Sequence, residues 1–217
     1  NYAKTRTEKL HLHVDAEQVY LKGLEAYPDN VELLVGLGCV HLLHLGKVDD
    51  AIREFEKANK LNPRHPLALN NMGYVNHHLK SNYVEAEAFY RKALQESPRL
   101  ELALRNLALL KVQTRSFGEA IEVYRQALHS AANDHETWKG YGDLLRSHLH
   151  DYPEAEKAYR QVLRIKPEDS SMWNTLGNLL QDYRSNPSEA REAYQRAIEI
   201  APNDSTCARC NLAFLHA

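Results

Sequence analysis

Proline returns along this chain at a nearly fixed interval, and this interval limits the fold more than any other feature. Successive prolines of the series stand 35, 35, 69 and 35 residues apart, and the 69 is one interval of 35 plus one of 34. The series is Pro28, Pro63, Pro98, Pro167 and Pro202, with Ala132 in the place of the missing proline. A period of this length is typical of stacked structural repeats and not of an ordinary globular core.

Other residue types follow the same interval. A small residue stands ten residues after each proline position: Gly38, Gly73, Ala108, Gly142 and Gly177. Alanine recurs at Ala51, Ala86, Ala120, Ala155 and Ala190. Four residues after each of these alanines comes an aromatic residue: Phe55, Tyr90, Tyr124, Tyr159 and Tyr194. Because each column holds residues of similar size and character, the repeats are expected to pack against one another in the same way.

Residues 66–100 show what one repeat contains. Apolar and small residues recur there at spacings of three and four, in two runs separated by a polar turn at 80–83. This spacing predicts two amphipathic helices. Asn82 followed by Glu85 predicts a capping box at the second helix, and the same device is expected at Ser116, Asp151 and Asn186. Gly73 is expected to face Ala86 across the helix pair.

The pattern resembles the tetratricopeptide repeat (TPR) family. In the last complete repeat the resemblance rests on Trp173, Leu176, Gly177, Ala190, Tyr194, Ala197 and Pro202. It implies an all-α fold, a right-handed α-solenoid of stacked antiparallel helix pairs that form the TPR superhelix. The usual period of the family is about 34 residues, whereas four of the five repeats here have 35, with the extra residue expected near the turn between the helices.

The whole chain, 1–217, is interpreted as one array. Its complete repeats are expected at 31–65, 66–100, 101–134, 135–169 and 170–204, with partial repeats at 1–30 and 205–217. Residues 1–30 are expected to hold parts of two helices, with a poorly helical stretch at Thr5–Thr7. Both ends lack a polar capping helix, so we expect that the chain was excised from a longer array or that a partner covers an end.

The resemblance implies that the first helix of each pair lines a concave groove that binds a peptide or protein segment. Polar and aromatic side chains at the inward positions are the candidate binding residues: Asn70, Tyr74, His77, Arg105, Lys139, Asp143, Arg146, Asn174, Asn178 and Gln181. Asn and Gln both donate and accept hydrogen bonds, so they suit the backbone of an extended peptide. The alternative interpretation is that these are ordinary solvated surface positions.

A carboxylate clamp for chaperone tails, which some TPR proteins carry, does not fit the sequence. The clamp needs Asn one turn after its Lys, but Lys139 is followed by Asp143 at that position. In the other register, Arg105 is followed one turn later by Leu109, where the clamp also needs Asn. Binding of chaperone tails is therefore not expected.

The motifs for metal binding and catalysis are weak. Of the histidine pairs, only His41 and His44 have a helical ligand spacing. Cys207 and Cys210 form a Cys-x-x-Cys motif, and His216 is the one further ligand nearby. There is no glycine-rich phosphate loop and no predicted strand for a nucleophile elbow. We therefore expect no metal, no cofactor and no enzymatic activity.

The composition of the chain limits the classes of partner that it is expected to bind. The net charge of −2 gives no basic footprint for nucleic acid, and no apolar run approaches the length of a membrane span. Three cysteines favour a reducing, cytoplasmic setting. The predicted function is a protein-interaction scaffold. The alternative is a regulatory or substrate-recruiting arm of a larger multidomain enzyme, and self-association through the open ends of the array is a third hypothesis.

Overall fold

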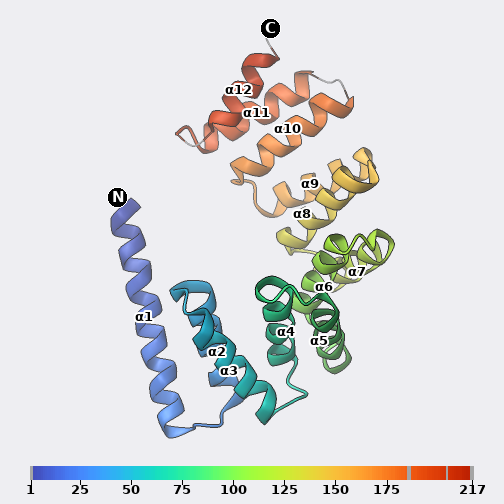
Figure 1. Ribbon diagram of the computed structural model, residues 1–217. Helices are drawn as coiled ribbons and strands as arrows, with labels where there is room; N and C mark the ends of the chain where they lie inside the picture. The colour runs from blue at the N-terminus through green and yellow to red at the C-terminus, as the bar shows by residue number, and fades with distance from the viewer. Residues whose placement is uncertain (1, 185–186, 204, 216–217) are drawn as a thin grey trace. The chain divides into compact units, whose positions relative to one another are not determined.

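The computed structural model describes residues 2–184, 187–203 and 205–215, and every regular element in these ranges is a helix (Figure 1). The all-α class of stacked antiparallel helix pairs that the sequence predicts is confirmed. The chain divides into two compact units, residues 1–110 and 111–217.

The first unit begins with a long N-terminal helix, and two complete helix pairs follow it along the chain (Figure 1). Its elements are α1 (Tyr2–Ala26), α2 (Val31–Val40), η1 (His41–Leu45), α3 (Val48–Leu61), α4 (Pro66–Tyr74), η2 (Val75–Leu79) and α5 (Tyr83–Glu96). Helix α6 (Glu101–Gln113) begins in this unit. Helix α2 pairs with α3 and α4 with α5, while α1 packs on α2 and α3 on α4, so each helix contacts the next one along the chain.

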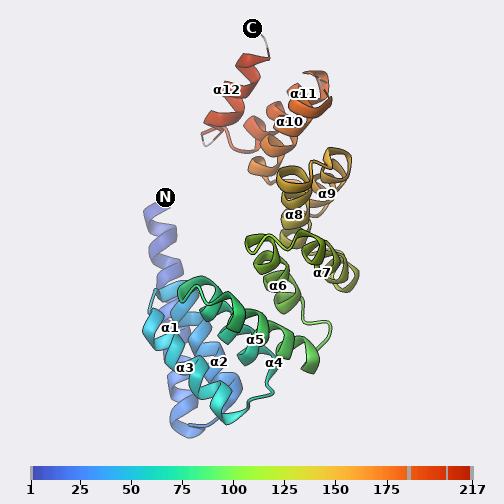
Figure 2. The ribbon, with the colours of Figure 1, turned by 45° about the vertical axis from the view of Figure 1, so that its right-hand side comes forward.

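The second unit repeats this arrangement (Figure 2). Its elements are α7 (Phe117–Ser130), α8 (His135–Leu144), η3 (Leu145–Leu149), α9 (Tyr152–Ile165), α10 (Ser170–Arg184), α11 (Pro187–Ile200) and α12 (Thr206–Phe214). Helix α8 pairs with α9 and α10 with α11. Contacts of α7 with α8, α9 with α10 and α11 with α12 join the pairs into a stack.

Side-chain caps begin most of the paired helices. Asn82 Oδ1 accepts from the Glu85 N–H at 3.4 Å, and Asp151 Oδ1 accepts from the Glu154 N–H at 3.3 Å, as the capping pattern predicts. The cap expected at Ser116 is wrong, because the Ser116 side chain makes no capping bond. Asn186 lies outside the described residues. Caps not predicted from the sequence stand before the first helices, at Asn30, His65, Asp134 and Asp169.

The repeated aromatic residues form the centre of each helix pair. Tyr90 is completely buried, and its ring lies against Gly73, where an added Cβ would stand 2.5 Å from the ring's Cε1. The expected facing of Gly73 and Ala86 stays a prediction, because the three atoms nearest to that Cβ all belong to Tyr90. Helical side chains point back toward the N-terminus of their helix, so the Tyr90 ring covers the surface one turn earlier, near Ala86. The glycine provides room for the ring.

The first helix of several pairs ends in a π-helical turn. Such turns occur at η1, η2 and η3, in three of the repeats that have 35 residues, whereas α6 of the 34-residue repeat is α-helical to Gln113. A π turn closes hydrogen bonds over five residues instead of four, so it accommodates one additional residue inside the helix. The residue that ends these segments adopts positive φ at Gly46 and His150, and Ser81 does so two residues after η2.

The N-terminal segment differs from the prediction. Helix α1 runs without a break from Tyr2 to Ala26, so the helix pair and the irregular stretch expected at Thr5–Thr7 are wrong. Glu17 explains how this helix is attached to the first pair. Its Oε1 lies 2.9 Å from His41 Nε2 and accepts from Lys47 Nζ at 2.5 Å, and the Glu17 side chain is only 10% exposed.

Candidate functional site

The predicted groove residues of the second unit lie on α8, η3 and α10. Lys139 is exposed, whereas the other five are half-buried: Asp143, Arg146, Asn174, Asn178 and Gln181. Asn174 and Asn178 are four residues apart and Gln181 follows three later, so all three share one face of α10. Half-buried polar side chains on a rigid helix can be held in fixed orientations, which is what a binding surface requires.

A buried tyrosine holds Asp143. The Tyr159 hydroxyl donates to Asp143 Oδ1 at 2.7 Å, and the Tyr159 side chain is fully buried in the pair of α8 and α9. Burial raises the pKa of Tyr159, the bond to Asp143 raises it further, and the positive charge of Arg146 opposes the rise. The phenol therefore stays protonated and remains a donor to Asp143.

The equivalent tyrosine of the next pair holds the amides of α10. The Tyr194 hydroxyl lies 2.8 Å from both Asn178 Oδ1 and Gln181 Oε1. A hydroxyl has one proton, so it donates to one of these oxygens at a time or is shared between them. Burial raises the pKa of Tyr194 to about 12. The hydroxyl of the buried Tyr194 side chain thus fixes the orientation of the Asn178 and Gln181 side chains.

Asn211 of α12 completes this arrangement, and the sequence analysis did not identify it as a site residue. Its Nδ2 donates to Asn174 Oδ1 at 3.1 Å and to Asn178 Oδ1 at 2.8 Å. Both acceptor oxygens are therefore engaged within the protein. Among the residues described, the Nδ2 groups of Asn174 and Asn178 remain available as donors. The only signal in the sequence was the start of a further repeat at Asn211.

In the first unit two of the predicted groove residues are internal. Asn70 is 3% exposed and its Oδ1 accepts from Asn106 Nδ2 at 3.0 Å, so it joins two first helices of the stack. His77 is 2% exposed, with its Nδ1 3.5 Å from the Tyr90 hydroxyl. These two side chains are not part of the accessible surface. Tyr74 and Arg105 are half-buried and keep surface to offer to a partner.

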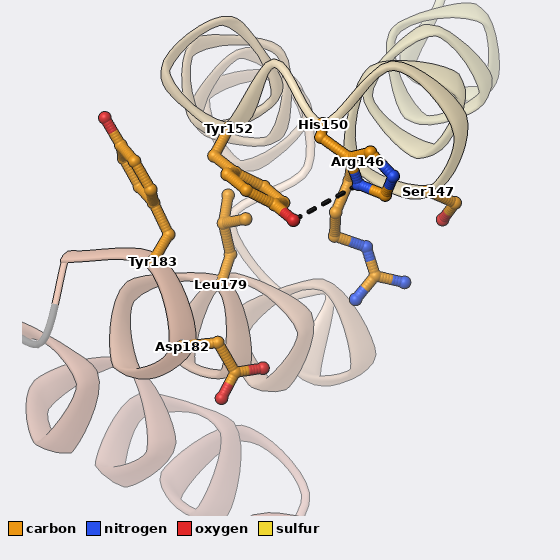
Figure 3. A pocket seen from close by; sticks show the side chains of 7 residues that line it. All are labelled: Arg146, Ser147, His150, Tyr152, Leu179, Asp182 and Tyr183. Carbon is orange, nitrogen blue, oxygen red and sulfur yellow. Dashed lines mark hydrogen bonds between the residues drawn. The ribbon is translucent and has the colours of Figure 1, made fainter.

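A pocket lies between the helix pairs of the second unit (Figure 3). Its volume is about 280 Å³, and it is lined by Arg146, Ser147, His150, Tyr152, Leu179, Asp182 and Tyr183. Figure 3 shows the Arg146 guanidinium directed toward the space beside Asp182. The Tyr152 hydroxyl and His150 Nδ1 form a 3.2 Å hydrogen bond along one side. Of the predicted groove residues, Arg146 therefore contributes to an actual hollow.

The described residues provide no metal site. No group of three or more His, Cys, Asp or Glu side chains in residues 2–184, 187–203 and 205–215 is arranged to hold a metal ion. Cys207 and Cys210 are free thiols on the exposed side of α12. His216, the further ligand considered for them, lies outside the described residues.

The repeated helix hairpins define a class of protein, the helical repeat proteins, and the sequence places the chain within that class. A profile of the tetratricopeptide repeat matches residues 40–101, 105–170 and 149–205, which is more than half of the chain. The chain belongs to the tetratricopeptide repeat family.

Known proteins resemble this chain at low sequence identity. The human protein O-mannosyl-transferase TMTC3 is 28% identical over 157 residues, an alignment that includes 55% of this chain and only 17% of that protein. The Cut9–Hcn1 structure of the APC/C matches 95% of this chain and 40% of its own at a TM-score of 0.79 and 19% identity. YrrB, described as a TPR protein with an unusual peptide-binding site, matches 90% of this chain and all of its own at a TM-score of 0.62 and 20% identity.

Proposed function

We propose that the surface formed by α8, η3 and α10 binds an extended segment of another protein. One observation carries this proposal: the amides of α10 are held from within by Tyr194 and Asn211, with the Nδ2 groups of Asn174 and Asn178 left as donors. Amide donors fixed in place before binding lose little entropy when a partner arrives. They suit backbone carbonyl oxygens, which every extended peptide presents.

The family and its known structures support this proposal. Tetratricopeptide repeats are typically non-catalytic protein-binding modules. YrrB shares the fold and is described as having a peptide-binding site. Lys139, Asp143 and Arg146 add charged groups to the same surface, and Tyr74 and Arg105 are the candidates for a binding surface on the first unit.

A random peptide library displayed on phage tests the proposal. Peptides selected on the wild-type protein are synthesised and titrated calorimetrically against Asn174→Ala, Asn178→Ala and Gln181→Ala. We expect each of the two asparagine variants to weaken binding by about tenfold, because each removes a hydrogen bond to the peptide. Gln195→Ala, at an exposed position on α11, is the matched control and should bind as the wild type does. Equal affinity in all variants would remove α10 from the binding surface.

A second candidate function is that of a recruiting arm of a larger enzyme. The similarity to protein O-mannosyl-transferase TMTC3 favours it, because this chain spans only 17% of that relative's length. In this role the surface on α10 would hold an acceptor protein while another domain transfers the sugar. The test is mannosyl transfer by the full-length protein that contains this chain, with and without Asn178→Ala. A change in KM for a protein acceptor, with kcat unchanged, is expected. An unchanged KM would count against recruitment by this surface.

The expected cellular location and the expected self-association of the chain stay predictions. None of the helices described is both long enough and apolar enough to cross a membrane. The cytoplasmic setting expected from the cysteine count and self-association through the ends of the array can be checked by localisation of the tagged protein and by sedimentation at two concentrations.

A further inference from the structure

We propose that the pocket between α10, η3 and the start of α9 receives an aromatic side chain whose neighbouring residue in the bound segment carries a carboxylate. This inference rests on the proposed function, since it specifies which segments the surface selects. Arg146 would bind the carboxylate, and the rings of Tyr152 and Tyr183 would contact the aromatic side chain. The pocket is shown in Figure 3.

The anion requirement comes from Arg146. Its Nε is buried without a hydrogen-bond partner among the described residues, and its guanidinium also interacts with the Tyr159 hydroxyl. The acidic groups that face it are Asp143 on its own helix, whose carboxylate accepts from Tyr159, and Asp182 on α10. Neither forms an ion pair with Arg146 in the part of the chain described. The terminal N–H groups of the guanidinium reach the pocket in Figure 3, and a planar carboxylate is the group that best matches such paired donors.

The aromatic requirement comes from the opposite side of the pocket. The ring centroids of Tyr152 and Tyr183 are 5.2 Å apart, within the range of interacting aromatic pairs, and Leu179 lies beside them. Tyr183 is 39% exposed, so part of its ring is available to a third aromatic group. The volume of about 280 Å³ is below the range of pockets that hold drug-sized molecules, about 300 to 1,000 Å³, and fits a single side chain.

Charge favours a carboxylate over a phosphate. Asp182 lines the same pocket and is exposed, so it repels any anion bound by Arg146. A phosphate group carries up to about two negative charges near neutral pH, whereas a carboxylate carries one. Asp143 and Asp182 both face this one guanidinium, so the singly charged carboxylate is repelled less than a phosphate would be.

The test uses the same peptide library, selected in parallel on the wild type, on Arg146→Gln and on Arg196→Gln. Arg196 is an exposed residue of α11 and provides a control with the same change of charge. We expect peptides from the wild type and from Arg196→Gln to be enriched in Asp or Glu beside Phe, Tyr or Trp. We expect this enrichment to disappear on Arg146→Gln.

A double-mutant cycle then measures the contact directly by fluorescence anisotropy. One selected peptide is compared with its Asp→Asn version on the wild type and on Arg146→Gln. Each single change should weaken binding by about tenfold, and the two together by little more, because they remove the same interaction. Arg146→Lys, which keeps the charge but not the paired donors, should be intermediate, and Tyr183→Leu should weaken the peptide that contains the aromatic residue. The melting curve of each variant confirms that it is folded.

Several outcomes would overturn the inference. Selected peptides that lack acidic residues, that are basic, or that bind Arg146→Gln unchanged would contradict it while leaving peptide binding in place. Tighter, Arg146-dependent binding of a phosphoserine version would replace the carboxylate by a phosphate. If no peptide is enriched on the wild type over an unrelated protein, the proposed function fails and this inference with it.

Discussion

The ring of Tyr90 fills the space that a side chain at residue 73 would need, since a Cβ on Gly73 would lie 2.5 Å from the ring's Cε1. Gly73→Ala should therefore lower the free energy of unfolding by about 1 to 3 kcal/mol, because the ring must move within a filled core. Gly118→Ala is the control: nothing lies within 4 Å of a Cβ there, and alanine should stabilise helix α7 by up to about 1 kcal/mol. Urea unfolding followed by circular dichroism measures both. Similar effects of the two substitutions would contradict this packing.

The alanine column provides a second test, on one helix. Ala86 is completely buried, whereas Ala88, two residues later on α5, is exposed. Ala86→Asp should lower the free energy of unfolding by several kcal/mol, on the order of 3 or more, because it overfills the core and buries a charge. Ala88→Asp should change it by less than about 1 kcal/mol. The same large loss is expected at Ala155 and Ala190, which are equally buried. A tolerated Ala86→Asp would show that the helices can separate at this point.

Ser81 has a backbone conformation that a glycine would adopt more easily. Its φ is +51°, in the left-handed region, where the equivalent residue of the preceding repeat is Gly46. A left-handed residue with a side chain costs about 1 to 2 kcal/mol, and glycine avoids most of this while losing up to about 1 kcal/mol through its freer unfolded chain. Ser81→Gly should therefore raise the free energy of unfolding by up to about 1 kcal/mol. Ser97→Gly is the control, because Ser97 has a φ of −138° and gains nothing from glycine. Equal shifts in their thermal midpoints would argue against strain at Ser81.

The regular part of the fold could be predicted from the sequence because it repeats. The columns of Gly73, Ala86 and Tyr90 recur five times, and repetition separates a structural requirement from chance. The partners within a column could not be predicted from spacing alone. Nothing in the sequence indicated that the Tyr90 ring lies on Gly73, because the direction of a long side chain, and not only its position in the sequence, decides which surface it covers.

The candidate site was predictable only in part. Phase along the repeat placed Asn174, Asn178 and Gln181 on one face of α10. Burial depends on neighbouring repeats, so the same phase gave no sign that Asn70 and His77 are internal. The pocket beside Arg146 needs side chains from the turn after η3 and from the end of α10, which no single repeat contains.

Glu17 predicts a specific dependence of stability on acid. Its bond to Lys47 is the main cause that lowers the pKa of Glu17 below 4.5, burial opposes this, and His41 adds to the lowering. The stabilisation is therefore present above the unfolded-state pKa near 4.5, and it is lost as the pH falls through the lower folded-state pKa. Glu17→Gln should lower the free energy of unfolding by about 1 to 3 kcal/mol at neutral pH. This difference in unfolding free energy from the wild type should become smaller in acid.

Urea titrations from neutral pH to values below 4.5 measure this difference, since the pKa of Glu17 in the folded protein is lower than 4.5. Glu25→Gln is the control, because Glu25 is an exposed residue of the same helix. It should show a small difference that does not vary in this way. A pH-independent difference for Glu17→Gln would mean that the ion pair with Lys47 does not attach α1 to the first helix pair.

Tyr194 gives the opposite dependence, at alkaline pH. Burial raises the pKa of its phenol from 10 to about 12, so the folded protein resists ionisation that the unfolded chain undergoes. The stabilisation is present below pH 10 and is lost as the pH rises through the folded-state value near 12. Tyr194→Phe should lower the free energy of unfolding by about 1 kcal/mol at neutral pH, because it removes the hydrogen bond to Asn178. This loss should become smaller as the pH approaches 12. Because Asn178 and Gln181 lose the group that orients them, peptide binding should also weaken. Unchanged affinity with lowered stability would show that Tyr194 supports the core alone.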